Sequence, residues 1–240
     1  MAEPKITETR CVGVDGAKRG WIAVWIDSQT IGYGVYCSPS DLLASHNGAA
    51  VIAVDVPIGL ADREGRIADS LARKFVGGRR ACSVFSAPVR GILDAESQPE
   101  ASRRHREIDG RGFGAQAFGI LSKIRDWDEL LRNNLVARSV VHEVHPEVSF
   151  AALNGSTGLA AGKKSSEGAL KREFLLGQVF GEAAVASLLS RVPRRSAAPD
   201  DVLDALIALW SARRIADGVA GSLPNPAVLD SAGLRIAIRY

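Results

Sequence analysis

The stretch VIAVDV at residues 51–56 constrains the fold of this chain more than any other feature. Nearly all of its residues are apolar and most are β-branched, a composition typical of a central strand that is buried on both faces. The turn residues Pro57 and Gly59 follow at once and end the run. Such a strand predicts an α/β domain in which helices cover both sides of a sheet.

Three further apolar runs precede this strand, at residues 11–15, 21–26 and 31–37. The turn GAKRG separates the first two runs, so we expect an antiparallel meander. A short helix follows at residues 39–46, with Ser40 as its expected N-cap. Later patterns predict helices at 113–133, 168–189 and 199–217, a strand at 139–144 and a last strand within 233–239. We therefore expect an α/β domain with a mixed sheet, three antiparallel strands followed by parallel ones.

Residues 61–112 form the least regular part of the chain and are rich in Arg, Gly and Ser. Eleven Lys and Arg face seven Asp and Glu between residues 63 and 111, so this segment accounts for the whole formal net charge of +3. We predict one domain over residues 1–240 with a basic, Arg-rich insertion at 61–112, helical near 67–75. The apolar helical face at 113–131 leaves two arrangements open, packing on the sheet or packing on a second subunit in a homodimer.

The composition also bounds the cellular setting. No apolar stretch approaches the roughly 18 residues of a membrane span. The polar residues 1–10 lack the apolar run of a signal peptide, and three widely spaced cysteines suggest neither a disulfide framework nor a zinc pattern. We expect a protein without membrane contact, located in the cytoplasm.

Two acids stand at the ends of predicted strands. Asp15 closes the first strand, where it either accepts hydrogen bonds from the following turn or faces a site at the edge of the sheet. Asp55 interrupts the most apolar strand, and a carboxylate there is costly to bury unless it is paired, hydrogen-bonded or metal-bound. Asp55 therefore favours a functional role.

The last long helix adds two more acids. Asp201 and Asp204 are three residues apart and share a face with Ala205 and Ala208, small residues that permit close approach to a sheet. Asp200 is explained as an N-cap, and the helix dipole favours an acid at position 201. The pair at 201 and 204 points toward other protein groups as well as toward water.

Glu143, at the end of the predicted strand 139–144, is the fourth candidate acid position, and Glu147 is a weaker one. Strand alternation places His142 and His145 on opposite faces, which argues against a histidine-ligated zinc site.

Six motifs occur in one order: GVDGAKRGW, VDVPIGL, SVFSAPVR, EVHPEVSF, the pair Lys163-Lys164 before a helix, and DDVLDAL. Together they resemble the family of predicted RNase H-like nucleases, domain of unknown function 429, over about residues 12–216. The resemblance implies an RNase H-like mixed sheet and a catalytic, metal-binding site made of Asp15, Asp55, Asp201 and Asp204, with Glu143 as a ligand or a supporting group. DVLDAL also resembles the closing acid pair of RuvC-type resolvases. In those enzymes the fourth-strand acid is a Glu, so Asp55 reaches one methylene less far.

Clustered carboxylates suit Mg²⁺ or Mn²⁺, which prefer oxygen ligands and support phosphodiester hydrolysis in pairs about 4 Å apart. We therefore predict a metal-dependent nuclease acting on nucleic acid. Trp21 and Phe85 are candidates for base stacking, although core packing is the favoured interpretation of Trp21. Basic residues near these motifs are candidate phosphate contacts or simply solvated charges: Lys18, Arg19, Arg79, Arg80 and Arg90.

Two alternatives stay open at this point. An actin-like ATP-dependent phosphotransferase also begins with a strand-end Asp and Gly, but 240 residues are few for its two domains and no Walker-type loop is present. A non-catalytic nucleic-acid-binding or scaffold protein with a vestigial site is the second alternative.

Overall fold

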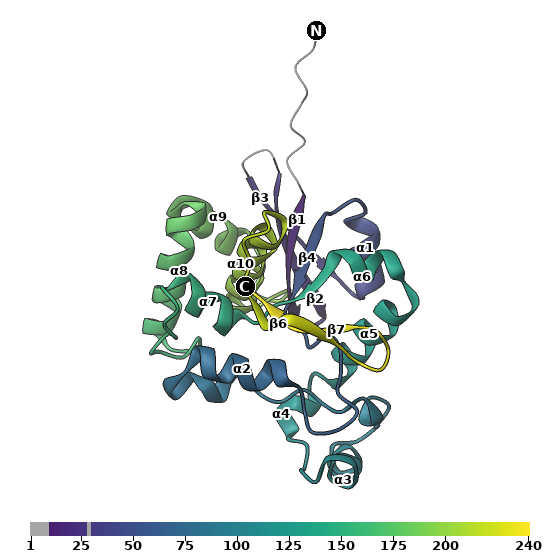
Figure 1. The fold of residues 1–240 in the computed structure, drawn as a ribbon. Coiled ribbons are helices and arrows are strands. Elements are labelled where there is room, and N and C mark those ends of the chain that lie inside the picture. The colour runs from purple at the N-terminus through teal and green to yellow at the C-terminus, as the bar shows by residue number, and fades with distance from the viewer. Residues whose placement is uncertain (1–9, 28–29) are drawn as a thin grey trace.

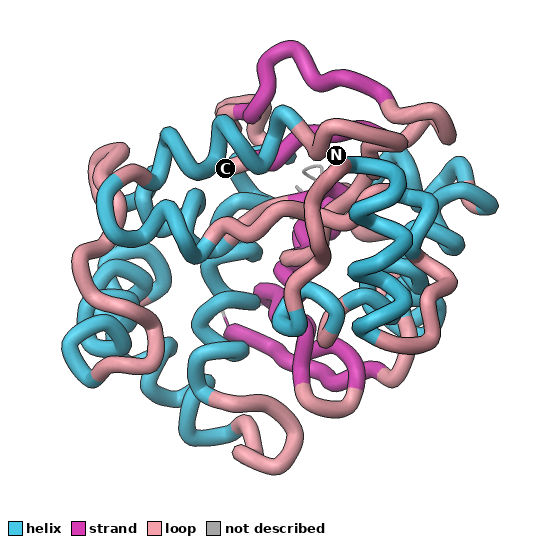
Figure 2. Tube along the Cα trace, turned by 90° about the horizontal axis from the view of Figure 1, so that it is seen from below, coloured by secondary structure: helices cyan, strands magenta, loops and turns pink. Residues whose placement is uncertain are grey.

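The computed structural model describes residues 10–27 and 30–240 and contains a five-stranded mixed sheet with helices on both faces (Figures 1 and 2). The order across the sheet is β3-β2-β1-β4-β5, in which β1–β3 are antiparallel and β4 and β5 run parallel to β1. The strands are β1 Cys11–Ala17, β2 Gly20–Asp27, β3 Thr30–Tyr36, β4 Val51–Val54 and β5 Val141–Glu143. The predicted mixed α/β sheet is confirmed. The polar run at residues 1–9 lies outside the described residues.

Alternation along the strands divides the core into two layers. Val12 and Val14 face one layer, and Cys11 and Ala17 face the other. The first layer is covered by α1 Pro39–Ser45, α5 Leu121–Asn133 and α6 Leu135–Val140, and the second by α8 Ser166–Phe180, α9 Glu182–Arg191 and α10 Pro199–Ala216 (Figure 1). The apolar face of α5 is buried in this core, so the sheet of the same chain covers it.

Helix α10 lies very close to β1, as its small residues predict. A Cβ added at Gly13 would lie 2.1 Å from the backbone N of Leu209 and 2.2 Å from the carbonyl O of Ala205. Ala205 and Ala208 are fully buried at this contact. This approach fixes the start of α10 beside the ends of β1 and β4.

Several predicted boundaries were wrong. The helix expected at 113–133 divides into α4 Ala115–Phe118 and α5, with Gly119 at the break, and the helix expected at 168–189 divides at Gly181, which has φ 89°. The N-cap of α1 is Ser38 rather than Ser40, because the Oγ of Ser38 accepts from the N–H of Asp41 at 3.1 Å. The strand expected at 139–144 begins only at Val141, since α6 extends to the residue before it.

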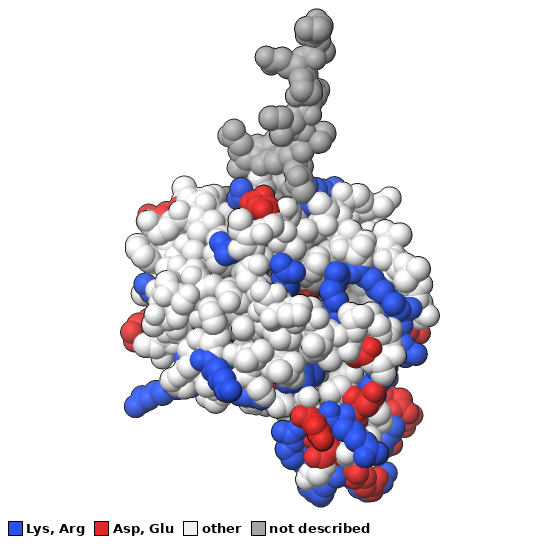
Figure 3. Space-filling model, viewed as in Figure 1, with Lys and Arg blue, Asp and Glu red and all other residues white. Residues whose placement is uncertain are grey.

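The insertion is more ordered than its composition predicts. It contains α2 Ile67–Val76, η1 Gly78–Ser83, η2 Arg90–Ile92 and α3 Gln98–Asp109. Ala68, Ala72 and Val76 of α2 form a small core with the end of the chain. Basic and acidic side chains are interspersed over α3 at the foot of the molecule (Figure 3). The charges of α3 therefore balance one another within the helix, and the net positive charge of the insertion lies outside it.

A hairpin of β6 Ser222–Leu229 and β7 Arg235–Arg239 follows α10. The expected strand within 233–239 is confirmed as β7, whereas β6 was missed because Pro224 and Pro226 argue against a strand. Val144, just after β5, pairs in parallel with Arg239. The hairpin thus closes the β5 side of the molecule over α2.

The short helix α7 Pro146–Leu153 connects β5 to α8 through a loop. No single helix in the described residues is long and apolar enough to span a membrane; α8 and α9 reach that length and composition only together, bent by 118°. All three cysteines are free thiols.

Candidate carboxylate site

A cavity of about 410 Å³ opens where β1 and β4 end and α10 begins. The parallel register pairs Val14 with Val54, and the N–H of Asp55 donates to the carbonyl of Val14 at 3.0 Å. Asp15 comes directly after Val14 and Asp55 directly after Val54. The two acids therefore lie at neighbouring positions on the α10 side of the sheet. The two predicted strand-end acids both line the cavity.

The third acid comes from α10. Asp204 is only 2% exposed and lines the same cavity, where its Oδ2 accepts a hydrogen bond from the Nζ of Lys163 at 2.6 Å. Asp201 also lines the cavity, but its Oδ2 accepts from the backbone N–H of Ala198 at 3.0 Å and closes the first turn of the helix. Ala198 occupies the N-cap position, so the predicted capping role of Asp200 was wrong.

Burial and mutual repulsion raise the pKa values of these acids. Burial, followed by the charges of Asp55 and Asp204, holds the pKa of Asp15 well above its ordinary value. Burial, followed by the charge of Asp204, raises the pKa of Asp55 to about 7, against the lowering effect of a hydrogen bond with Asp15. Burial also raises the pKa of Asp204 to about 6, although Lys163 lowers it. The site therefore resists full ionisation without added positive charge.

The cations around the cavity leave two of its acids unpaired. The Nζ of Lys163 lies 2.6 Å from the Oδ2 of Asp204 and 3.9 Å from the Oδ2 of Asp200. In the part of the chain that the structure describes, no Lys or Arg nitrogen lies within 4.0 Å of a carboxylate oxygen of Asp15 or Asp55. The buried carboxyl group of Asp15 and the half-buried one of Asp55 thus lack any direct ion-pair partner among the described side chains.

A family model described as "Protein of unknown function (DUF429)" matches residues 13–228. The chain belongs to the DUF429 family. The match confirms the resemblance drawn from the six motifs, and its description assigns no activity. The chain is also 41% identical over 51 residues to the cytidylate kinase of Pectobacterium carotovorum subsp. carotovorum (strain PC1), a segment covering 21% of this chain and 23% of that kinase. The chain thus matches less than a quarter of the kinase's length, and no solved structure matches it significantly.

In this DUF429 protein Glu143 does not join the carboxylate cluster. Glu143 pairs with Val54 in the register, and both lie on the sheet face opposite to Asp55. Its two oxygens accept hydrogen bonds from Arg66, at 2.6 and 2.8 Å, and from the N–H of Ile58 at 2.8 Å. Glu143 lines the cavity, but its carboxylate is held in a buried ion pair with an arginine of the insertion, which favours the supporting role over that of a metal ligand. The sequence gives no signal of this pair, because 77 positions separate the two residues.

Glu147 is similarly engaged. Its Oε1 accepts from the Nη2 of Arg80 at 2.6 Å and from the Nη2 of Arg172 at 2.7 Å. Arg80 also lines the cavity of the DUF429 protein, but its guanidinium is paired with Glu147, another residue of the cavity wall. The Oε2 of Glu147 is buried without a hydrogen-bond partner among the described residues.

The basic residues predicted to contact nucleic acid differ in their exposure and in their ion-pair partners. Lys18 and Arg19 are exposed in the turn after β1, and Arg79 is exposed on η1. Arg90 does not line the cavity; it pairs with Asp128 at 2.6 Å and with Asp230. The phosphate contact expected of Arg90 is thus replaced by ion pairs within the fold.

Of the two aromatic candidates, only Phe85 is accessible. Both residues line the cavity, but Phe85 is 43% exposed, whereas Trp21 is 2% exposed and packs edge-on against Trp127 in the core. The core packing favoured for Trp21 is therefore confirmed.

Sequence reasoning missed Lys123, which lines the cavity from α5 and donates from Nζ to the carbonyls of Ala17 at 2.8 Å and Gly20 at 3.0 Å. Its position within the predicted helix 113–133 was the only available signal.

The oxygen-rich donor set of the DUF429 site fits a hard divalent cation. Asp15, Asp55 and Asp204 offer carboxylate oxygens, the ligands that Mg²⁺ and Mn²⁺ prefer. A cation there would offset the repulsion that now raises their pKa values. Within residues 10–27 and 30–240, no three His, Cys, Asp or Glu side chains already stand in metal-binding geometry. Metal binding would therefore require side-chain adjustment, including displacement of Lys163 from Asp204.

Proposed function

We propose that this DUF429 protein is a metal-dependent phosphodiester hydrolase that acts on nucleic acid. The observation that carries the proposal is the pair of buried Asp15 and half-buried Asp55, which line one cavity with Asp204 and have no direct ion-pair partner among the described side chains. Clustered carboxylates of this kind are costly to a fold unless they bind protons or cations. The motifs shared with predicted RNase H-like nucleases support the same assignment.

In this proposal Asp15, Asp55 and Asp204 hold one or two Mg²⁺ or Mn²⁺ ions. Such ions, when bound, neutralise phosphate charge and increase the acidity of water. Asp201 keeps α10 in place by capping its first turn, which orients Asp204 toward the strands. Lys163 neutralises part of the acidic charge and, once released from Asp204, is placed to contact a phosphate oxygen.

The rim of the cavity offers groups for a nucleic-acid strand. Phe85 presents an exposed ring on which a base can stack. Lys18 and Arg19, in the turn beyond β1, are exposed and free to contact phosphates on one side, and Arg79 on another. The free thiols Cys11, Cys37 and Cys82 fit a location in the reducing cytoplasm.

The direct test is an incubation with labelled single-stranded, duplex, hybrid and branched RNA and DNA in Mg²⁺ or Mn²⁺. We expect cleavage of at least one substrate, abolished by EDTA. Removing a metal-binding group should reduce the rate at least about a hundredfold, as in Asp55→Asn. Arg103→Gln, which alters an exposed ion pair on α3, is the matched control and should cleave normally. Cleavage unaffected by Asp55→Asn, or by EDTA, would contradict the proposal.

Binding assays with ATP and with nucleic acid, run beside the cleavage assay, separate the alternatives. An ATP-dependent phosphotransferase would bind ATP without cutting nucleic acid, and a scaffold would bind nucleic acid equally well in EDTA. The 51-residue similarity to a cytidylate kinase covers too little of either chain to favour phosphoryl transfer over hydrolysis.

A further inference from the structure

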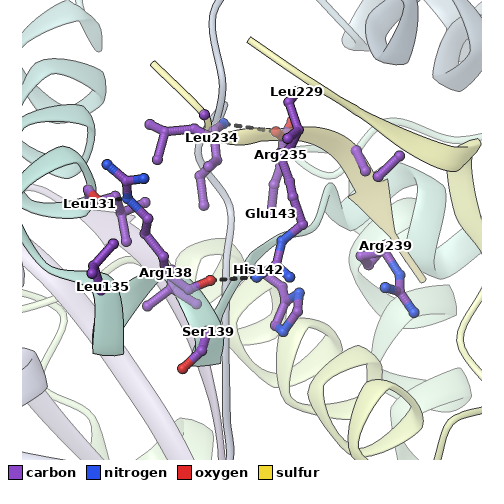
Figure 4. Close-up of a pocket in the computed structure, with 15 residues that line it drawn as sticks. Leu131, Leu135, Arg138, Ser139, His142, Glu143, Leu229, Leu234, Arg235 and Arg239 are labelled. Atoms are coloured by element: carbon purple, nitrogen blue, oxygen red, sulfur yellow. Dashed lines mark hydrogen bonds between the residues drawn. The ribbon is translucent and has the colours of Figure 1, made fainter. Parts of the chain in front are cut away.

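A second cavity, of about 330 Å³, lies on the outer side of β5 between the α5–α6 region and the C-terminal hairpin (Figure 4). Among the described residues, only Glu143 lines both cavities, and its carboxylate is bound to Arg66. The two cavities differ in charge, because aspartates line the first and arginines line the second. The walls of this second cavity are largely apolar. Their apolar side chains come from α5, α6, β5 and the hairpin: Leu131, Leu135, Val141, Leu229 and Leu234.

Arg138 of α6 lines this cavity, and strand β7 supplies two further arginines by simple alternation. Ile236 and Ile238 point to the small core with α2. Arg235, Ala237 and Arg239 therefore lie on the other face, and all three line the cavity. Strand β7 thus buries its apolar face and presents two arginines, four positions apart, on the face toward the cavity.

These arginines have no acidic partner. In the described ranges, no Asp or Glu oxygen lies within 4.0 Å of a side-chain nitrogen of Arg235 or Arg239. Arg235 donates from Nη2 to the carbonyl of Arg138, and Arg239 donates from Nε to the carbonyl of Gly221 at 3.1 Å. Each guanidinium keeps further N–H groups for a ligand.

His142, from β5, lies beside these charges (Figure 4). Burial, followed by the charges of Arg235 and Arg239, lowers the pKa of His142 to about 4. Burial, followed by the charge of Arg235, also lowers the pKa of Arg239. A cavity with this much uncompensated positive charge favours an anion.

We propose that this second cavity binds a small organic phosphate, with the phosphate group on Arg235, Arg239 and His142 and an apolar body against the leucine-rich wall. Arginine suits phosphate because its planar fork of donors matches two phosphate oxygens. The volume suits a compact ligand, since small-molecule sites begin at roughly 300 Å³. The proposal is independent of hydrolysis at the carboxylate site.

Phenyl phosphate is a suitable probe, with inorganic phosphate and phenol as its two halves. NMR would follow the His142 ring, assigned by comparison with His142→Gln. We expect phenyl phosphate to shift this resonance, to raise the pKa of His142 above about 4, and to bind more tightly than either half. Arg235→Gln and Arg239→Gln should each weaken binding about tenfold or more, the effect of losing a hydrogen bond to a charged group.

Two further variants sharpen the test. Leu135→Ser, at a side chain that is 75% exposed, should weaken phenyl phosphate but not inorganic phosphate. Arg103→Gln removes one positive charge on α3, outside the cavity, and should leave binding unchanged. The proposal is overturned if the His142 resonance does not respond, if both β7 variants bind phenyl phosphate like the wild type, or if inorganic phosphate binds as tightly as phenyl phosphate.

Discussion

Arg66 binds Glu143 through both terminal nitrogens, Nη2 to Oε1 at 2.6 Å and Nη1 to Oε2 at 2.8 Å. The same guanidinium donates to Asp69 from Nε at 3.1 Å and from Nη2 at 2.6 Å. All three residues are at most 5% exposed. This buried triad connects α2 of the insertion to β5, and it forms one wall of the carboxylate cavity.

Replacing Arg66 should destabilise the fold strongly. Arg66→Met leaves two buried carboxylates without their cation, and breaking a buried pair in this way costs about 3–5 kcal/mol. The free energy of unfolding from urea titrations measures the loss. Arg103→Gln is the comparison, since both partners of its ion pair are about 60% exposed and its loss should cost under about 1 kcal/mol. Equal small losses in the two variants would show that the triad does not stabilise the fold.

Glu143→Gln should leave metal affinity within about threefold of wild type, because the carboxylate faces Arg66 rather than Asp55. The measurement is a Mn²⁺ titration of a variant shown by circular dichroism to be folded. A loss of binding as large as that of Asp55→Asn would instead make Glu143 a metal ligand.

The contact between α10 and β1 admits no side chain at position 13. Gly13→Ala would force a Cβ against the backbone of Leu209 and Ala205, and overpacking of this kind costs about 1–3 kcal/mol. Thermal unfolding should show a clear fall in Tm. Gly114→Ala is the matched control, because a Cβ there meets no atom within 4 Å. A Tm unchanged by Gly13→Ala would mean that the helix can move away from the sheet at little cost.

The carboxylate site also predicts a pH dependence of stability. The pKa of Asp55 is raised to about 7 in the folded protein from an ordinary value of 3.8. Between about pH 4 and pH 7 the folded state therefore holds more protons than the unfolded state, so stability falls as pH rises. One such proton changes the free energy of unfolding by up to about 1.4 kcal/mol per pH unit.

Urea titrations in EDTA from pH 4 to pH 8 test this dependence. Wild type should lose stability relative to Asp55→Asn as pH rises, whereas the exposed Asp126→Asn variant should follow wild type. A constant difference between wild type and Asp55→Asn across this range would show that Asp55 titrates normally.

Local patterns predicted the sheet and part of the candidate site because their physical causes are local. The buried run before Asp55 and the small residues after Asp204 were sufficient to place both acids at one end of the sheet. The place of Asp15 follows from the parallel register of β1 and β4.

Long-range charge pairing was not predictable in the same way. Whether Glu143 is a ligand or an ion-pair partner depends on Arg66, and whether Arg90 is available depends on Asp128 and Asp230. Such partners are brought together only by the tertiary fold. Strand β6 was missed for a local reason, since its prolines contradict strand propensity.

The most direct measurement is a calorimetric titration of Mn²⁺ into wild type, Asp15→Asn and the double variant Asp55→Asn, Asp204→Asn. We expect wild type to bind Mn²⁺ and both variants to lose binding while remaining folded. Absence of binding in wild type, or binding unchanged in both variants, would contradict the assignment of a metal site to these three carboxylates.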